Sequence, residues 1–107
     1  MTSPEERARS LERMLEKRPD DARIRFALAV EYLNQGRPDD GVRELEAYLA
    51  SSDDEGNAWG RLASALIDLG RTDEARDAYR KGIAAAERHG HPTMAEEFAA
   101  DLDGLDG

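Results

Sequence analysis

The chain of 107 residues contains no cysteine, which excludes disulfide bridges, cysteine-ligated zinc sites and thiol nucleophiles. Its first ten residues, MTSPEERARS, have no apolar core, so a signal peptide is not expected there. No apolar run approaches the roughly 20 residues that a membrane-spanning helix requires. The sequence therefore predicts a cytoplasmic protein without a membrane partner.

Positive charge is scarce, because 15 arginines and lysines stand against 24 acidic residues and the formal net charge is -9. Only Lys17 and Lys81 are lysines. This balance disfavours nonspecific attraction to nucleic-acid phosphates and anionic lipids, so no nucleic-acid partner is expected. The hydrophobic fraction of 39% and the charged fraction of 36% are typical of one folded domain with a well-solvated surface.

Alternation of period two is missing as well, and valine and isoleucine are few, so the sequence predicts no strand. Apolar residues instead recur at spacings of three and four, which is the helical period. The pattern predicts about six helices, over roughly residues 4–18, 22–35, 39–50, 55–69, 73–88 and 93–102. Short connections between them favour antiparallel neighbours. The acidic, glycine-rich end, DLDGLDG, is expected to fray.

Capping residues support these boundaries. Ser3 is followed three residues later by Glu6, as a capping box requires, and Asp21 precedes the second helix. Thr72 is the predicted cap of the fifth helix. Gly36 and Gly70 follow helices at positions where a left-handed residue commonly ends a helix. The helix starts marked by caps and the helix ends marked by glycines both agree with the boundaries that the apolar period predicts. Local chemistry and patterning thus predict an all-α chain.

The chain also repeats itself. The segment WGRLASALIDLG, which begins at Trp59, matches the segment RFALAVEYLNQG, which begins 34 positions earlier at Arg25. A fixed self-similarity of this length indicates stacked units of supersecondary structure. The positions shared by the two segments are Leu28/Leu62, Ala29/Ala63, Leu33/Ile67 and Gly36/Gly70.

These residues resemble the tetratricopeptide repeat, whose pattern of tryptophan, leucine, glycine, tyrosine, alanine, phenylalanine and proline extends over 34 positions. The second unit carries it at Trp59, Leu62, Ala63, Leu66, Ala75 and Tyr79, and the first at Leu28, Ala29, Tyr32, Gly41 and Leu45. The resemblance implies an α-α superhelix, or solenoid, of antiparallel helix pairs. It divides one domain, 1–107, into a half repeat at 4–19, repeats at 22–55 and 56–89, and a closing helix at 92–103.

Several residues depart from the family pattern, among them Arg7 in the half repeat and Met14 and Gly82 at the slot of Tyr48, and two departures bear most on the packing. Arg25 stands where the first repeat would have its tryptophan, and Tyr48 occupies a slot that is usually small. A tyrosine at that slot is too large for a close contact between helices, so it puts the stacking geometry there in question.

The resemblance also implies a function. In this family the first helix of each unit lines a concave groove that binds an extended or helical peptide from a partner protein. By register, the groove-facing positions of this chain are Arg23, Phe26, Ala27, Val30, Leu33 and Asn34 in the first repeat and Asn57, Gly60, Arg61, Ser64, Ile67 and Asp68 in the second. Some family members clamp a terminal carboxylate in this groove, but apolar Phe26 and Val30 occupy two of the clamp positions here.

The strip formed by Phe26, Val30 and Leu33 lies on one helical face, because its members are spaced i, i+4 and i+7. It could bind a peptide, pack against the closing helix or bind a second copy of the chain. The leading hypothesis is a scaffold that binds a peptide segment of a partner protein. The alternative is a structural self-association module, a homodimer without a separate ligand.

Catalysis and cofactor binding are not predicted. The sequence contains no nucleophile–base pair with recognisable spacing, no phosphate-binding loop and no zinc-protease motif. His89 and His91, with Glu87, Glu96 and Glu97 nearby, leave a metal-assisted hydrolase as a third and weaker hypothesis. The two histidines flank a glycine in a predicted turn rather than sharing a helical face, so we interpret them as a solvated loop.

Overall fold

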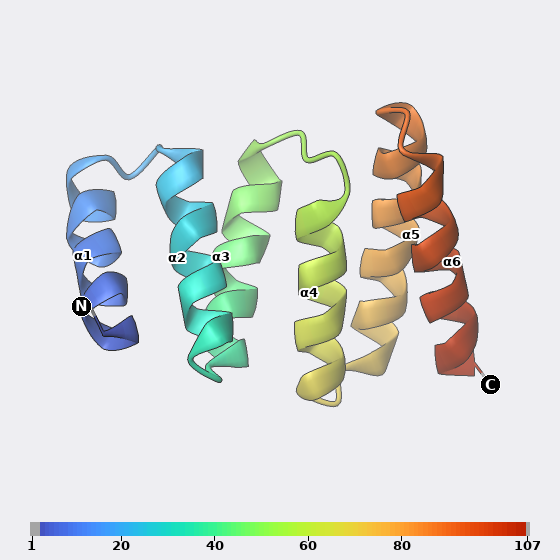
Figure 1. Cartoon of the computed structure of the whole chain (residues 1–107), viewed down its shortest axis with the longest axis horizontal. Coiled ribbons are helices and arrows are strands. Elements are labelled where there is room, and N and C mark those ends of the chain that lie inside the picture. The colour runs from blue at the N-terminus through green and yellow to red at the C-terminus, as the bar shows by residue number, and fades with distance from the viewer. Residues whose placement is uncertain (1–2, 107) are drawn as a thin grey trace. The chain divides into compact units, whose positions relative to one another are not determined.

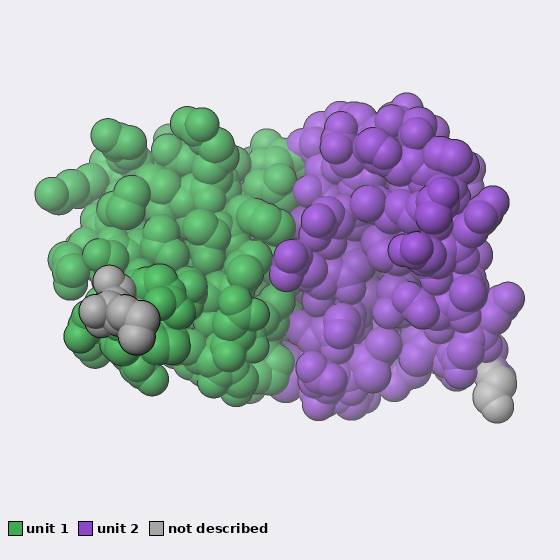
Figure 2. Space-filling model, in the orientation of Figure 1, with its two compact units in different colours: residues 1–52 green, residues 53–107 purple. Residues whose placement is uncertain are grey.

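The computed structural model describes residues 3–106 and shows, in that range, six α-helices and no strand (Figure 1). This confirms the all-α prediction. The chain divides into two compact units, residues 1–52 and 53–107 (Figure 2). The helices of the first unit are α1 (Pro4–Lys17), α2 (Ala22–Asn34) and α3 (Pro38–Ser51), and those of the second are α4 (Asn57–Asp68), α5 (Thr72–Arg88) and α6 (Pro92–Asp106).

In the first unit, α2 packs against both α1 and α3, and successive helices are antiparallel (Figure 1). Leu28 and Tyr32 of α2 form a core with Ala8 of α1. On α3, Val42 and Leu45 are the largest fully buried side chains of the described residues. Helix α2 therefore buries apolar side chains on two sides, one against α1 and one against α3.

In the second unit, α5 is the central helix and packs against both α4 and α6. Its buried positions are mostly small, which allows neighbouring helices to approach closely. The buried residues of α5 are Ala75, Ala78, Tyr79, Gly82, Ala85 and Ala86.

Capping side chains begin the helices, and glycines end them, largely as the sequence predicts. Ser3 Oγ accepts a hydrogen bond from the Glu6 amide at 3.2 Å, and Asp21 caps α2 through two amides. Gly36 and Gly70 have φ angles of 72° and 74°, which favour glycine because it lacks a Cβ atom. Thr72 is not the cap that the sequence predicts, because it already belongs to α5 and makes no capping bond.

The C-terminal segment does not fray where the sequence predicts. Helix α6 continues to Asp106, beyond the expected end at residue 103. Arg76 of α5 explains the extension, because its Nε lies 2.7 Å from Asp106 Oδ1 and its Nη2 donates to the Leu105 carbonyl oxygen at 3.4 Å. The arginine is 30 residues from Asp106 in sequence, so local patterning gives no sign of this contact.

The departures from the repeat pattern at Arg25 and Tyr48 have structural explanations within the first unit. In place of a tryptophan, Arg25 bridges Glu44 Oε2 at 2.9 Å and the Pro19 carbonyl oxygen at 3.1 Å. Glu44 is only 8% exposed, so the pair neutralises a buried carboxylate. Tyr48 packs its ring against that of Phe26, with centroids 5.1 Å apart, and this aromatic pair accommodates its bulk.

The glycine at position 60 predicts a measurable packing effect. A Cβ atom on Gly60 would lie 2.7 Å from two atoms of the Phe98 ring, whereas one on Gly104 meets nothing within 4 Å. Gly104→Ala should raise the free energy of unfolding by about 0.5–1 kcal/mol through helix propensity alone. Gly60→Ala should lower it by about 1–2 kcal/mol, because overpacking exceeds that gain. Urea unfolding measures both, and equal stabilisation by the two changes would contradict the Phe98 packing.

Tyr32 predicts a loss of stability in alkali. Burial, together with a 2.8 Å hydrogen bond to Glu12 Oε1, raises the pKa of its phenol from 10.0 to about 12. The folded state therefore holds this proton more tightly than the unfolded state, so the stabilisation is complete below pH 10 and is lost as pH rises towards 12. The loss should be about 2–3 kcal/mol. The free energies of unfolding of the wild type and of Tyr32→Phe, measured by urea unfolding at several pH values, should converge between about pH 10 and 12. A constant difference between the two over this range would contradict the assignment.

Candidate functional site

In the first unit, the predicted groove positions of α2 differ in how accessible they are. Arg23 and Asn34 are exposed, while the four apolar positions between them are half-buried. Phe26 packs on Tyr48, and Leu33 fills the space over Gly41, where a Cβ atom would lie 2.3 Å from Leu33 Cδ2. Much of the predicted apolar strip therefore packs inside its own helix pair, and the glycine and tyrosine of α3 are the sequence signals of that packing.

In the second unit, four of the six predicted groove positions of α4 line one hollow of about 460 Å³. They are Asn57, Gly60, Arg61 and Ser64. Ile67 and Asp68 are exposed and do not line it. The repeat register thus brings together a coherent part of the predicted site.

The opposite wall comes from α6, which sequence reasoning did not include in the site. It contributes Met94, Glu97, Phe98 and Asp101, and Tyr79 of α5 completes the lining. Phe98 can lie here because both Gly60 and Gly82 lack a side chain, as a Cβ atom on either would approach its ring to 2.7 Å or 3.1 Å. The spacing of Met94 and Phe98 by four residues, facing two glycines, is the signal that could have revealed this wall.

The polar groups of the hollow are unevenly distributed. On α4, Arg61 Nε donates a hydrogen bond to Asn57 Oδ1 at 2.9 Å. On α6, Glu97 and Asp101 are exposed carboxylates. The ring of Tyr79 lies 5.8 Å from that of Phe98, and burial, together with the charge of Asp101, raises the pKa of Tyr79. The hollow therefore combines an apolar floor with a donor-rich wall and an acidic wall.

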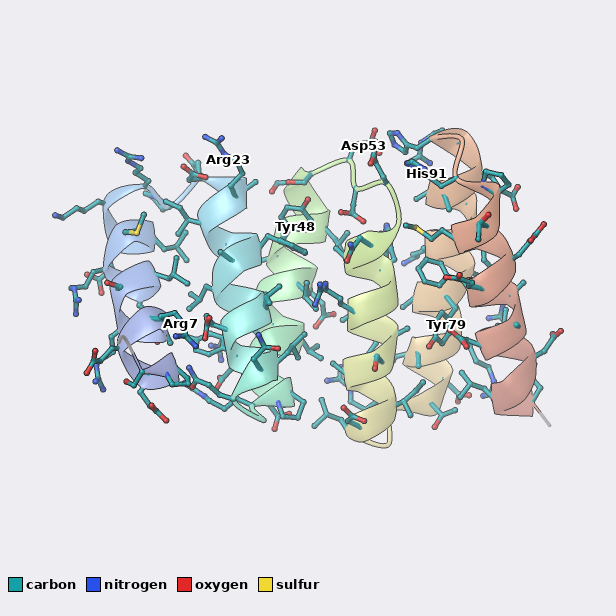
Figure 3. The ribbon with its side chains drawn as sticks, in the orientation of Figure 1. Arg7, Arg23, Tyr48, Asp53, Tyr79 and His91 are labelled. Atoms are coloured by element: carbon teal, nitrogen blue, oxygen red, sulfur yellow. The ribbon has the colours of Figure 1, made fainter. Side chains whose placement is uncertain are left out.

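The two histidines lie at the turn between α5 and α6 and contact the segment before α4, at the end of the unit where Figure 3 labels Asp53 and His91. His89 Nε2 is 3.1 Å from Asp53 Oδ2, and His91 Nε2 is 3.4 Å from Glu55 Oε2. Hydrogen bonds from Arg88 and His89 lower the pKa of Asp53. These contacts tie the segment to the turn, and no group of three or more potential metal ligands occurs in residues 3–106.

Within residues 3–106, no helix combines the length and the apolar character needed to cross a bilayer.

Antiparallel helix pairs with small residues at their contacts define the class of helical-repeat proteins. A family model described as tetratricopeptide repeat matches residues 26–89. A TPR repeat-containing protein of Pseudomonas aeruginosa is 31% identical over 96 residues, which are 90% of this chain and 91% of that protein. The chain therefore belongs to the tetratricopeptide repeat family, as its sequence predicts.

Solved structures agree with this assignment. A crystal structure of MamA superposes with a TM-score of 0.70 over 92% of this chain and is 19% identical, so it bears on the fold alone. Two structures of MamA AMB-1 are 25% identical, with TM-scores of 0.66 and 0.64. The chain spans 62–66% of the length of these three structures. The predicted solenoid class of antiparallel helix pairs is confirmed.

Family membership also bears on function in general terms. Tetratricopeptide repeats form a fold that presents surfaces to other proteins, so membership of the family makes this chain a protein-interaction scaffold in that general sense.

Proposed function

We propose that the chain binds a peptide segment of a partner protein, and that the hollow of the second unit is a docking site for it. The observation that supports this proposal is the lining of the hollow. Four positions of α4 that the repeat register predicts to face a groove line one concave surface together with residues of α6. Concave surfaces with an apolar floor and a few polar groups are where ligands commonly bind.

The composition of the hollow favours a peptide over a metal ion or a compact cofactor. Its floor is built from Met94, Phe98 and Gly60, and its rim from exposed polar side chains such as Asn57 and Ser64. An apolar centre with a polar rim is the usual anatomy of a protein–protein contact. A segment passing between α4 and α6 would place side chains on the floor and its backbone at the rim.

The first unit offers a separate surface to the same kind of partner. On α2, exposed Arg23 and Asn34 flank half-buried Phe26, Ala27, Val30 and Leu33. In the second unit, Ile67 of α4 is an exposed apolar position outside the hollow. Because two full repeats present little surface, we expect moderate affinity, with a Kd on the order of micromolar.

Selection from a displayed random peptide library tests the proposal. Peptides retained by the wild-type protein should bind Ser64→Arg about tenfold more weakly, because the change places a bulky side chain in the hollow. The control is Ala84→Arg, which makes the same change of charge at an exposed position of α5 outside the lining. Fluorescence anisotropy with labelled peptides measures both affinities.

The control variant should bind within about twofold of wild type. Two results would contradict the proposal: failure of the wild-type protein to retain any peptide, or equal weakening by Ser64→Arg and Ala84→Arg.

The homodimer alternative makes a different prediction. Among the large hydrophobic side chains of residues 3–106, only Met14, at 46%, and Ile67, at 37%, are exposed. Stable homodimers bury extended apolar surfaces. We therefore expect analytical ultracentrifugation at about 50 µM to show a monomer, because the exposed apolar area is small. A dimer at this concentration that dissociates on Val30→Glu would instead support self-association through the strip.

A further inference from the structure

The hollow of the second unit is lined by a tyrosine whose hydroxyl group the fold does not use. The Tyr79 side chain is only 6% exposed, its oxygen remains accessible, and it forms no hydrogen bond within residues 3–106. It lies on α5 beside α6, as Figure 3 shows, and it lines the hollow and packs its ring against that of Phe98. An accessible hydroxyl oxygen that lines a hollow and has no protein partner can form a hydrogen bond there with water or with a group of a ligand.

The adjacent wall of the hollow carries two carboxylates without a cation. Glu97 and Asp101 are four residues apart on α6, so both lie on the same face and repel each other. Within residues 3–106 neither forms an ion pair. The acids of this unit are otherwise often paired, since Arg76 pairs with Asp73 and Asp106.

The floor between these groups is apolar and suited to a hydrocarbon chain. Met94 and Phe98 form it, and the absence of a side chain at Gly60 keeps it open. Lysine and arginine side chains place their methylene groups on such surfaces while the charged head remains at a polar edge. An aromatic ring below the head adds a favourable cation–π contribution.

Building on the proposed function, we propose that this hollow binds a lysine or arginine side chain of the partner peptide. The aliphatic stem packs on Met94 and Phe98, the cationic head lies between the carboxylates of Glu97 and Asp101, and the Tyr79 oxygen accepts a hydrogen bond from it.

The charge of the lining disfavours the other classes of peptide side chain. With Glu97 and Asp101 on one wall and Arg61 on the other, the lining has one net negative charge, and the chain as a whole carries -9. An acidic side chain would meet two carboxylates near the Tyr79 oxygen. An aliphatic side chain would cover the carboxylates without neutralising them, which costs free energy.

Three short probes test the specificity directly. Capped single amino acids, N-acetyl-lysine, N-acetyl-norleucine and N-acetyl-glutamate methylamides, share a backbone and differ in the head group. Titrated into the ¹⁵N-labelled full chain, the lysine probe should shift the backbone amides of Gly60 and Gly82 in a saturable way. The norleucine and glutamate probes should cause shifts at least about fivefold smaller at equal concentration.

Variants of α6 separate the site from general attraction to an acidic protein. Glu97→Gln/Asp101→Asn should weaken binding of the lysine probe about fivefold or more. Glu96→Gln/Asp103→Asn removes the same charge from exposed positions of the helix outside the lining and should leave binding within about twofold. Tyr79→Phe should weaken binding about twofold to threefold without lowering the melting temperature, because the phenol has no protein partner to lose.

The outcomes distinguish this inference from the proposed function. Equal shifts from the norleucine and lysine probes, or equal loss in the two α6 double variants, would overturn the cation site. Library peptides that bind the wild-type protein but show no excess of lysine or arginine would overturn the cation site as well, and would leave peptide binding intact. A wild-type protein that binds neither the lysine probe nor any library peptide would overturn both.

Discussion

In both units a large side chain of one helix fills the space over a glycine of a neighbouring helix. Phe98 of α6 lies against Gly60 and Gly82, and Leu33 of α2 lies against Gly41. No single helix of such a protein can bury its apolar side alone, so its stability depends on contacts of this kind. The contact at Phe98 also forms the floor of the hollow, which makes the candidate site a direct product of the packing that holds α6 in place.

Ion pairs provide a second set of links between helices, and arginine provides nearly all of them. Arg7 pairs with Glu31 between α1 and α2, and Arg25 pairs with Glu44 between α2 and α3. In the second unit, Arg76 reaches from α5 to the last residues of α6. The planar guanidinium group can bind a carboxylate and a carbonyl oxygen together, as Arg76 does, which a lysine cannot do with the same fixed geometry.

The sequence predicts those features that depend on neighbouring residues. The cap at Ser3 and the left-handed ends at Gly36 and Gly70 follow from local chemistry, and the repeat register locates the α4 side of the hollow. It does not predict the α6 wall, because Phe98 meets Gly60 38 positions away in the chain. The extension of α6 was missed for the same reason, since Arg76 acts across 30 residues. Thr72 was misassigned because threonine is acceptable both at a cap and inside the first helical turn.

The division of the hollow between α4 and α6 has a consequence for its specificity. Positions on α4 are constrained by the repeat, because the same helix must present Leu62, Ala63 and Leu66 to the buried side. Helix α6 lies outside residues 26–89, which the tetratricopeptide repeat model matches, and its single buried residue is Ala95. Its exposed face can therefore vary at little cost to packing, and the two carboxylates that repel each other there lie on that face. A repeat that supplies a general docking surface and a closing helix that supplies its charge would separate the requirements of folding from those of recognition.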